Sequence, residues 1–79
     1  MNVKVFLVDD HAILRNGLRQ ALTQQPGLAV VGEAPTGATA LELAVPLAQD
    51  LIVMDIHLPD MSGLEVTRQI LAKWRRTER

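Results

Sequence analysis

Acidic side chains follow two apolar runs of this 79-residue chain, at the point where each run ends. Asp9 and Asp10 come directly after residues 5–8, and Asp55 comes directly after residues 51–54. Two unit charges about 4 Å apart repel by about 4 kcal/mol at an effective dielectric constant of about 20. Clustered carboxylates are therefore either partly protonated or neutralised by a cation. Carboxylate oxygens and water suit Mg²⁺, so the pattern predicts a magnesium site if the two runs are neighbouring strands.

Each of these positions also has an ordinary structural reading. Asp10 could cap a following helix, and Asp55 could simply close a strand. Two acidic strand ends, together with the turn that follows Asp55, favour a shared site over coincidence. His11 and His57 lie close by in the sequence, but they lack the i, i+4 spacing of a helical zinc site. We therefore expect both histidine side chains to be solvated.

Three short apolar runs predict β-strands, at residues 3–8, 28–31 and 51–54, and Gly32 ends the second run. The first run is nearly continuous, which is typical of a strand covered on both faces. Because strands alternate with helical segments, right-handed crossovers and a parallel α/β sheet are expected. With the first strand in the middle, the order is 2-1-3, helices cover both faces, and the acidic residues meet where strands lie about 4.8 Å apart.

Helical periodicity follows each apolar run. The first helix places apolar residues at i, i+4, i+7 and i+8 on one face and stops at Pro26. That face consists of Leu14, Leu18, Ala21 and Leu22. The second helix begins near Gly37 and ends before Pro46. The third begins at a capping box that opens with Ser62 and continues with apolar residues at i, i+4 and i+8, which are Val66, Ile70 and Trp74.

The composition is that of a small globular domain, with 48% hydrophobic and 22% charged residues, a net charge of −1 and no cysteine. The absence of cysteine excludes disulfides and thiolate metal sites. The apolar run after Met1 is too short for a signal peptide, and no run has the length of a membrane span. We expect a cytoplasmic protein without membrane association.

Basic residues gather near the C-terminal end, where Glu78 is the only acidic residue after position 65. They are Arg68, Lys73, Arg75, Arg76 and Arg79. Such a cluster indicates either an acidic or nucleic-acid partner, or a helix end whose dipole it complements. The chain offers no aromatic platform and no supported reading helix, so direct binding of nucleic acid is not expected.

Several segments resemble the receiver domain of bacterial two-component response regulators, particularly of the LuxR/FixJ type. These segments are VDDH at 8–11, RNGL at 15–18, GEA at 32–34, Gly37 with Ala40 and Leu41, and MDIHLPDMSG at 54–63. The resemblance covers residues 1–74 as the N-terminal part of a receiver, and leaves 75–79 as a basic tail that is either a helix end or disordered. It implies a flavodoxin-like fold.

The resemblance also implies a chemistry. Asp55 would be the phosphoacceptor, whose carboxylate attacks a phosphoryl group carried by a histidine kinase. Mg²⁺ would be held by Asp10 directly, by Asp9 through water, by Asp55, and by the backbone carbonyl of His57. The chain would then be a signalling phosphoacceptor and not an enzyme acting on a separate substrate.

The sequence departs from the family in length, since a receiver has five β/α units and three are present. The Ser/Thr of the fourth strand and the Lys of the fifth, which contact the phosphoryl group, have no counterpart. The resemblance therefore implies a truncated receiver that is impaired in phosphotransfer. Strand 51–54 would be an exposed sheet edge, and we expect self-association through it, most simply as a two-fold dimer. A non-catalytic dimerising module derived from a receiver is the alternative function.

Overall fold

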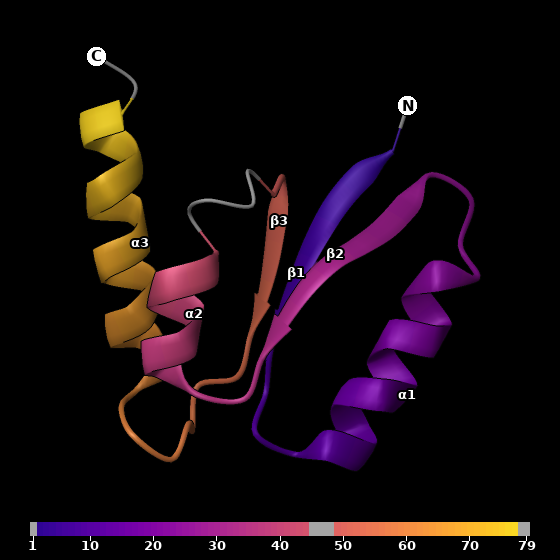
Figure 1. Cartoon of the computed structure of the whole chain (residues 1–79), viewed down its shortest axis with the longest axis horizontal. Coiled ribbons are helices and arrows are strands. Elements are labelled where there is room, and N and C mark those ends of the chain that lie inside the picture. The colour runs from indigo at the N-terminus through magenta and orange to yellow at the C-terminus, as the bar shows by residue number, and fades with distance from the viewer. Residues whose placement is uncertain (1, 45–48, 78–79) are drawn as a thin grey trace.

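The computed structural model describes residues 2–44 and 49–77, with side chains described up to residue 73. Strands and helices alternate along the chain (Figure 1). They are β1 (Val3–Val8), α1 (Ala12–Thr23), β2 (Leu28–Ala34), α2 (Gly37–Leu43), β3 (Leu51–Met54) and α3 (Gly63–Thr77). The strands are parallel in the order β2-β1-β3, with α1 on one face and α2 and α3 on the other (Figure 1). The predicted strand order and two-sided cover are confirmed.

β1 is the central strand and pairs with β2 on one side and β3 on the other. Its apolar sequence suits a strand that is covered on both faces. Val5, Phe6, Leu7 and Val8 are each at most 1% exposed. Successive side chains of a strand point to opposite faces. Phe6 and Val8 join the main core together with Ala34, Ala40, Ala44, Leu58, Val66 and Ile70. The core therefore lies between the sheet and the pair α2 and α3.

Two predicted features of the helices fall at the limits of the described residues. Val66 and Ile70 are buried as their spacing predicts, whereas the side chain of Trp74 lies outside the described part. The predicted end of the second helix at Pro46 also lies outside it. α3 runs to Thr77 and so continues into the tail predicted at residues 75–79. In the described ranges, no helix is long and apolar enough to cross a bilayer.

β2 is longer than predicted, since it continues past Gly32 to Ala34. Val5 pairs with Val30 and Phe6 with Gly32, so Val31 is an extra residue opposite β1. Such a bulge lets a strand accommodate glycine and keep its ladder. The prediction that Gly32 ends the strand was wrong because the neighbouring β1 runs on and offers further hydrogen bonds. As a result, the N–H of Asp9 donates to the carbonyl of Ala34 at 3.1 Å.

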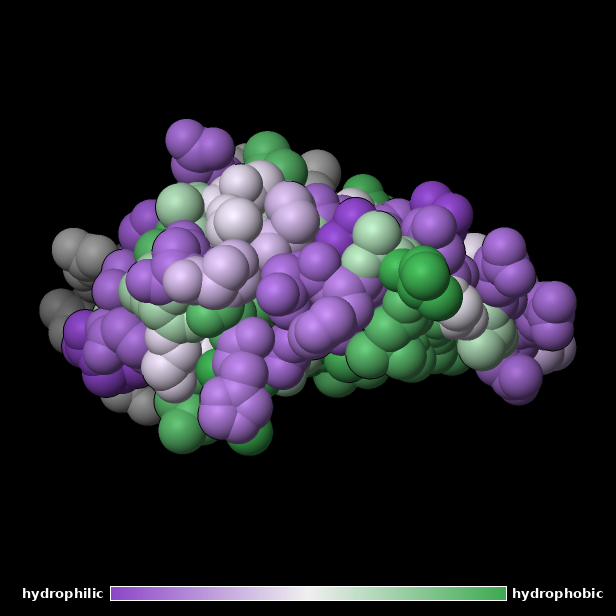
Figure 2. All heavy atoms as spheres, turned by 90° about the horizontal axis from the view of Figure 1, so that it is seen from below, coloured by the Kyte–Doolittle hydropathy of each residue, from purple (hydrophilic) through white to green (hydrophobic). Residues whose placement is uncertain are grey.

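The face of the sheet covered by α1 is packed more loosely than the opposite face. α1 contains no buried residue, and the face predicted to point inward is only partly covered. Leu18 and Leu22 are half-buried, whereas Leu14 is 53% exposed and Ala21 is also exposed. The cause is that α1 contacts β1 and β2 but leaves β3 open, where Val53 is 37% exposed. Apolar surface therefore gathers over the half of the molecule that contains α1 (Figure 2).

The parallel arrangement gives the sheet two different ends, one formed by the carboxyl ends of the strands and one by their amino ends. The first turns of α2 and α3 begin at the carboxyl end of the sheet (Figure 1). The start of β1 and the end of α3 lie at the amino end (Figure 1). The acidic residues that follow β1 and β3 therefore share the carboxyl end of the sheet.

Candidate functional site

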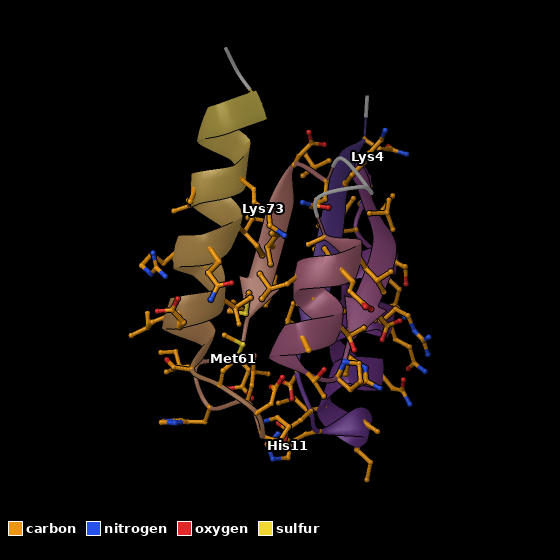
Figure 3. The ribbon with its side chains drawn as sticks, turned by 60° about the vertical axis from the view of Figure 1, so that its left-hand side comes forward. Lys4, His11, Met61 and Lys73 are labelled. Carbon is orange, nitrogen blue, oxygen red and sulfur yellow. The ribbon has the colours of Figure 1, made fainter. Side chains whose placement is uncertain are left out.

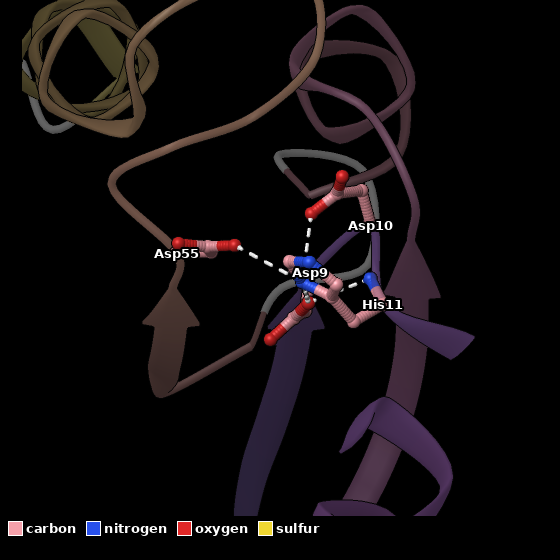
Figure 4. Close-up of side chains that lie close together, drawn as sticks. All are labelled: Asp9, Asp10, His11 and Asp55. Carbon is pink, nitrogen blue, oxygen red and sulfur yellow. Dashed lines mark hydrogen bonds and ion pairs between the residues drawn. The ribbon is translucent and has the colours of Figure 1, made fainter. Parts of the chain in front are cut away.

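β1 and β3 bring three carboxylates to one place (Figure 4). Asp9, Asp10 and Asp55, together with His11, each offer a ligand atom, and these atoms all lie within 4.8 Å of one another. Asp9 is 7% exposed, whereas the side chains of Asp10 and Asp55 are 30% and 22% exposed. The site is thus an acidic pocket with one buried wall and one open side, as the strand ends predict.

A hydrogen-bonded backbone turn orients the carboxylate at the end of each strand. The N–H of His11 donates to Oδ1 of Asp9 at 2.8 Å, and the N–H of His57 donates to Oδ1 of Asp55 at 3.0 Å. Both turns connect an aspartate to the residue two positions later, which is a common turn for this side chain. Asp55 is held further by its own N–H, which donates to the carbonyl of Val8 at 2.9 Å. Each carboxylate keeps its second oxygen available.

The imidazole of His11 turns back into the acidic cluster (Figure 4). Its Nδ1 lies 3.1 Å from Oδ1 of Asp9, 3.1 Å from Oδ1 of Asp10 and 3.9 Å from Oδ2 of Asp55. The hydrogen bond with Asp9, and then the charge of Asp10, raise the pKa of His11 above its usual 6.5. The side chain is 67% exposed, as the prediction of a solvated histidine requires, but its contact with the carboxylates was not predicted. Its position two residues after a strand-end aspartate does not predict this contact, because His57 has the same spacing from Asp55.

His57 behaves differently from His11. It is exposed, and it pairs through its backbone with Ser62 in an isolated antiparallel bridge. Among the described residues, the cluster of possible metal ligands does not include the His57 side chain. The resemblance assigns a metal-ligand role only to its backbone carbonyl, and this role stays a prediction.

The loop after β3 is fixed by contacts with α2 and α3. The carboxylate of Asp60 accepts hydrogen bonds from the N–H groups of Gly37 and Ala38 at 2.8 and 2.9 Å, and these bonds lower the pKa of Asp60. Met61 packs between the bases of the two helices (Figure 3). A Cβ atom built on Gly63 would overlap the carbonyl oxygen of Asp55. The loop can therefore follow this path only with glycine at position 63.

Arg15 supports the loop after β1. Its guanidinium donates to the carbonyl of Asp9 at 2.5 Å and to Oε1 of Glu33 on β2 at 3.1 Å. Arg19 also donates to Glu33, at 3.2 Å. These contacts join α1 to β2 and fix the backbone of Asp9 through its carbonyl oxygen. The positive charge of Arg15 is thus directed to a backbone carbonyl and to Glu33.

A groove of about 290 Å³ opens beside the carboxylates on the α1 side of the sheet. It is lined by Val8, Asp9, His11, Leu14, Leu18, Val53, Met54 and Asp55. One end is acidic and the other apolar, so a small charged group can reach Asp55 from solvent. Three clustered carboxylates with few neutralising partners supply oxygen donors that fit a divalent cation.

Comparison with known proteins gives a consistent result. The family model for the response regulator receiver domain matches residues 5–79. The chain is 43% identical over 70 residues to the transcriptional regulatory protein YdfI of Bacillus subtilis strain 168, covering 89% of this chain and 33% of that protein. It is 42% identical over 69 residues to the nitrate/nitrite response regulator protein NarL of Escherichia coli strain K12, covering 87% of this chain and 32% of that protein.

Solved structures of related proteins also resemble this fold closely. A two-component response regulator of the LuxR family from Aurantimonas sp. SI85-9A1 superposes with a TM-score of 0.86 at 40% identity. The match covers 94% of this chain and 52% of that one. The chain thus spans about a third of the length of the curated relatives that it matches and about half of the solved structure.

Proposed function

This chain belongs to the response regulator receiver family, and from that premise we propose that it acts in two-component signalling with Asp55 as its phosphoacceptor. The observation that carries the proposal is the convergence of Asp55 with Asp9 and Asp10 at the carboxyl ends of β1 and β3. A nucleophilic carboxylate beside two further carboxylates is the arrangement that Mg²⁺-dependent phosphoryl transfer to aspartate needs. Regulation of transcription by the whole protein is part of the proposal.

The geometry of Asp55 assigns different tasks to its two oxygens. Oδ1 accepts the N–H of His57, which fixes the plane of the carboxylate, and Oδ2 faces the cluster 3.9 Å from Nδ1 of His11. In the proposed reaction Oδ2 attacks the phosphorus of a phosphohistidine on a kinase. The new P–O bond forms as the P–N bond breaks, and the electron pair of that bond stays on the imidazole of the kinase. A Mg²⁺ ion bound by Asp9, Asp10, Asp55 and the His57 carbonyl would neutralise charge on the transferred group.

For the 79-residue polypeptide on its own, we propose that this reaction is slow. The described residues that line the groove beside Asp55 include no Lys, Ser or Thr that could pair with a phosphoryl group. Negative charge that develops on that group would then have fewer partners than preorganised sites provide. The polypeptide would consume a phosphoryl group once and would not turn over a separate substrate.

Phosphorylation by a small phosphodonor tests the proposal. The 79-residue chain is incubated with acetyl phosphate and Mg²⁺, and incorporation is followed by intact mass. We expect slow incorporation of one phosphoryl group and none in Asp55→Asn. Asp60→Asn is the matched control, because Asp60 lies on the same loop but its carboxylate binds the start of α2. Incorporation that persists in Asp55→Asn would contradict the assignment.

The partners follow from the same proposal. A histidine kinase would donate the phosphoryl group in the cytoplasm, and the open side of β3 would join a second copy of the chain. In the described part of the chain β3 pairs only with β1, and its Leu51 and Val53 are 49% and 37% exposed. A groove of about 160 Å³ next to it is lined mainly by apolar residues of β3 and α3. This surface favours the second candidate function, a dimerising module without phosphotransfer.

Sedimentation velocity at several concentrations tests the dimer. We expect the sedimentation coefficient of the 79-residue chain to rise with concentration, and Val53→Lys to abolish that rise while leaving the circular dichroism spectrum unchanged. A compact monomer at every concentration would exclude self-association through β3.

A further inference from the structure

The loop after β1 enters α1 without the usual supports of a helix start. In α1, which the structure describes in full, His11 stands at the N-cap without a side-chain cap, the first turn holds no acidic residue, and no residue is buried. By contrast, the start of α2 is capped by the side chain of Thr36 and by the carboxylate of Asp60. The loop that carries the first two carboxylates must therefore be fixed by other contacts.

Arg15 makes such contacts at both ends of that loop. Its backbone N–H donates to the carbonyl of His11 at 2.8 Å, and its guanidinium donates to the carbonyl of Asp9 at 2.5 Å. The turn between these two carbonyls is closed by the N–H of His11, which donates to Oδ1 of Asp9 at 2.8 Å. One residue of α1 thus holds both ends of the segment that carries Asp9 and Asp10.

Glu33 connects this support to the sheet. Its Oε1 accepts a hydrogen bond from Arg15 at 3.1 Å, and the two side chains are only 23% and 18% exposed, so water screens this ion pair less than a pair on the open surface. The next residue of β2, Ala34, accepts the N–H of Asp9 at 3.1 Å. Both polar groups of the Asp9 backbone are therefore tied to β2, the N–H directly and the carbonyl through Arg15.

We infer that Arg15 is a positioning residue for the acidic site, and that, anchored by Glu33, it sets the affinity of the folded chain for Mg²⁺. This inference rests on the proposed function, because the cation would bind the same carboxylates. A carboxylate whose backbone is fixed in advance loses less conformational freedom when it binds an ion. Arg15 acts on the cation through the backbone of Asp9, since its guanidinium is directed to that carbonyl and to Glu33.

Arg19 provides a matched control on the same helix. It also donates to Glu33, at 3.2 Å, and its second contact is with Oδ1 of Asn16, also at 3.2 Å. Neither contact involves the loop after β1. An effect that comes from positive charge beside β2 should appear when either arginine is replaced, whereas an effect of positioning should appear only at Arg15.

The test compares the 79-residue chain with Arg15→Lys, Arg19→Lys and Glu33→Asp, none of which changes the net charge. Calorimetry at one pH gives the Mg²⁺ affinity, and NMR without Mg²⁺ gives the rate of solvent exchange of the His11 amide. We expect Arg15→Lys to weaken Mg²⁺ by about tenfold, because lysine cannot donate in two directions and loss of a residue that orients a metal ligand costs at least that much. The His11 amide should exchange about 2- to 10-fold faster. Arg19→Lys should change both quantities by less than about twofold.

Glu33→Asp tests the anchor. It keeps the charge but shortens the side chain, so we expect a change in the same direction as Arg15→Lys, and a smaller one. In the double variant, Mg²⁺ should bind no more weakly than in Arg15→Lys alone, since two residues that act through one chain of contacts are not additive. Additive losses would overturn the inference, because Glu33 would then act independently of Arg15.

Other results would overturn the inference as well. A merely structural role of Arg15 would lower the free energy of unfolding and leave the Mg²⁺ affinity of the folded chain unchanged. Weaker Mg²⁺ binding with unchanged exchange of the His11 amide would mean that Arg15 does not fix the turn. Circular dichroism checks that each variant is folded, and Glu33→Asp, which leaves Arg15 in place, decides the matter if Arg15→Lys does not fold.

Asp10→Asn separates this inference from the proposed function. If Asp10→Asn weakens Mg²⁺ and Arg15→Lys does not, only the inference fails. If Asp10→Asn leaves the Mg²⁺ affinity unchanged, the carboxylates do not hold the cation, and the metal site of the proposed function fails together with the inference.

Discussion

Two loops leave the sheet side by side, one after β1 and one after β3, and both begin with an aspartate that accepts the N–H of a histidine two residues later. After that shared turn they differ. The first enters α1 at once, and His11 stands at the N-cap with its ring among the carboxylates. The second runs on to Gly63, with Asp60 bound to the start of α2. The turn orients the carboxylate in both loops, whereas the chain that follows decides where the imidazole lies.

The two loops are also supported by different forces. The loop after β3 leads into α3, whose Val66 and Ile70 are buried in the main core. The loop after β1 leads into α1, which has no buried residue, and depends instead on the hydrogen bonds of Arg15. Steric changes should therefore damage the second loop most, and changes of charge and hydrogen bonding should damage the first.

The largest effect is expected from Gly63→Ala. The added Cβ would overlap the carbonyl oxygen of Asp55, so the loop or the end of β3 must move. Overpacking of this kind costs about 2–3 kcal/mol. Urea denaturation should show that loss in the free energy of unfolding. An unchanged urea midpoint would mean that the loop after β3 can shift to accommodate the added Cβ at little cost in free energy.

A smaller loss is expected from Arg15→Lys. Lysine keeps the charge but cannot donate in the forked geometry that reaches both the Asp9 carbonyl and Glu33. We expect a loss of about 1–2 kcal/mol in the free energy of unfolding. Arg19→Lys is the matched control, because the Arg19 side chain is 44% exposed and does not contact Asp9. Equal effects of the two substitutions would remove the special role of Arg15.

Gly17→Ala should act in the opposite direction from Gly63→Ala. Gly17 lies inside α1, and a Cβ built there meets no atom within 4 Å. Replacing glycine with alanine inside a helix stabilises by about 0.5–1 kcal/mol. The same urea titration measures the gain. Destabilisation would show that α1 is packed more closely than the exposure of its residues indicates.

The smallest effect concerns acid pH and the start of α3. Hydrogen bonds from Arg68 and Gln69 lower the pKa of Glu65 from 4.5 to about 2. A lowered pKa means that the folded state favours the charged form, so this contribution to stability is complete above pH 4.5 and is lost as the pH falls toward 2. Glu65→Gln should therefore flatten this part of the stability curve slightly, because the contact is on the surface. Thermal melts of both proteins between these limits check it.

The sequence predicted those features that depend on one strand or one helix at a time. Apolar runs predicted the three strands, and helical spacing predicted the burial of Val66 and Ile70. The order 2-1-3 came from placing the first strand in the middle, as the resemblance to a receiver implies, and the structure has that order. The bulge at Val31 could not be predicted, since it depends on the pairing between β1 and β2. The exposure of Leu14 depends on which strands α1 covers. The spacing of apolar residues within the helix carries no information about that.

The same limit applies to the candidate site. The three carboxylates could be predicted because each ends a strand, and parallel strands end at one edge. The position of the His11 ring could not, because both histidines have the same local sequence relation to an aspartate. Only the immediate start of α1 after His11 separates them, and that is a matter of backbone path.

The separation of the carboxyl and amino ends of the sheet has a practical consequence for experiments with this molecule. The start of β1 and the end of α3 both lie on the side remote from the carboxylates, at opposite flanks of the molecule (Figure 1). A bead, a fluorescent label or a sensor surface attached near either end would lie away from the carboxylates, which would remain exposed to the bulk solution. Immobilised protein should therefore meet ions and phosphodonors as freely as dissolved protein, without a spacer between the chain and its support.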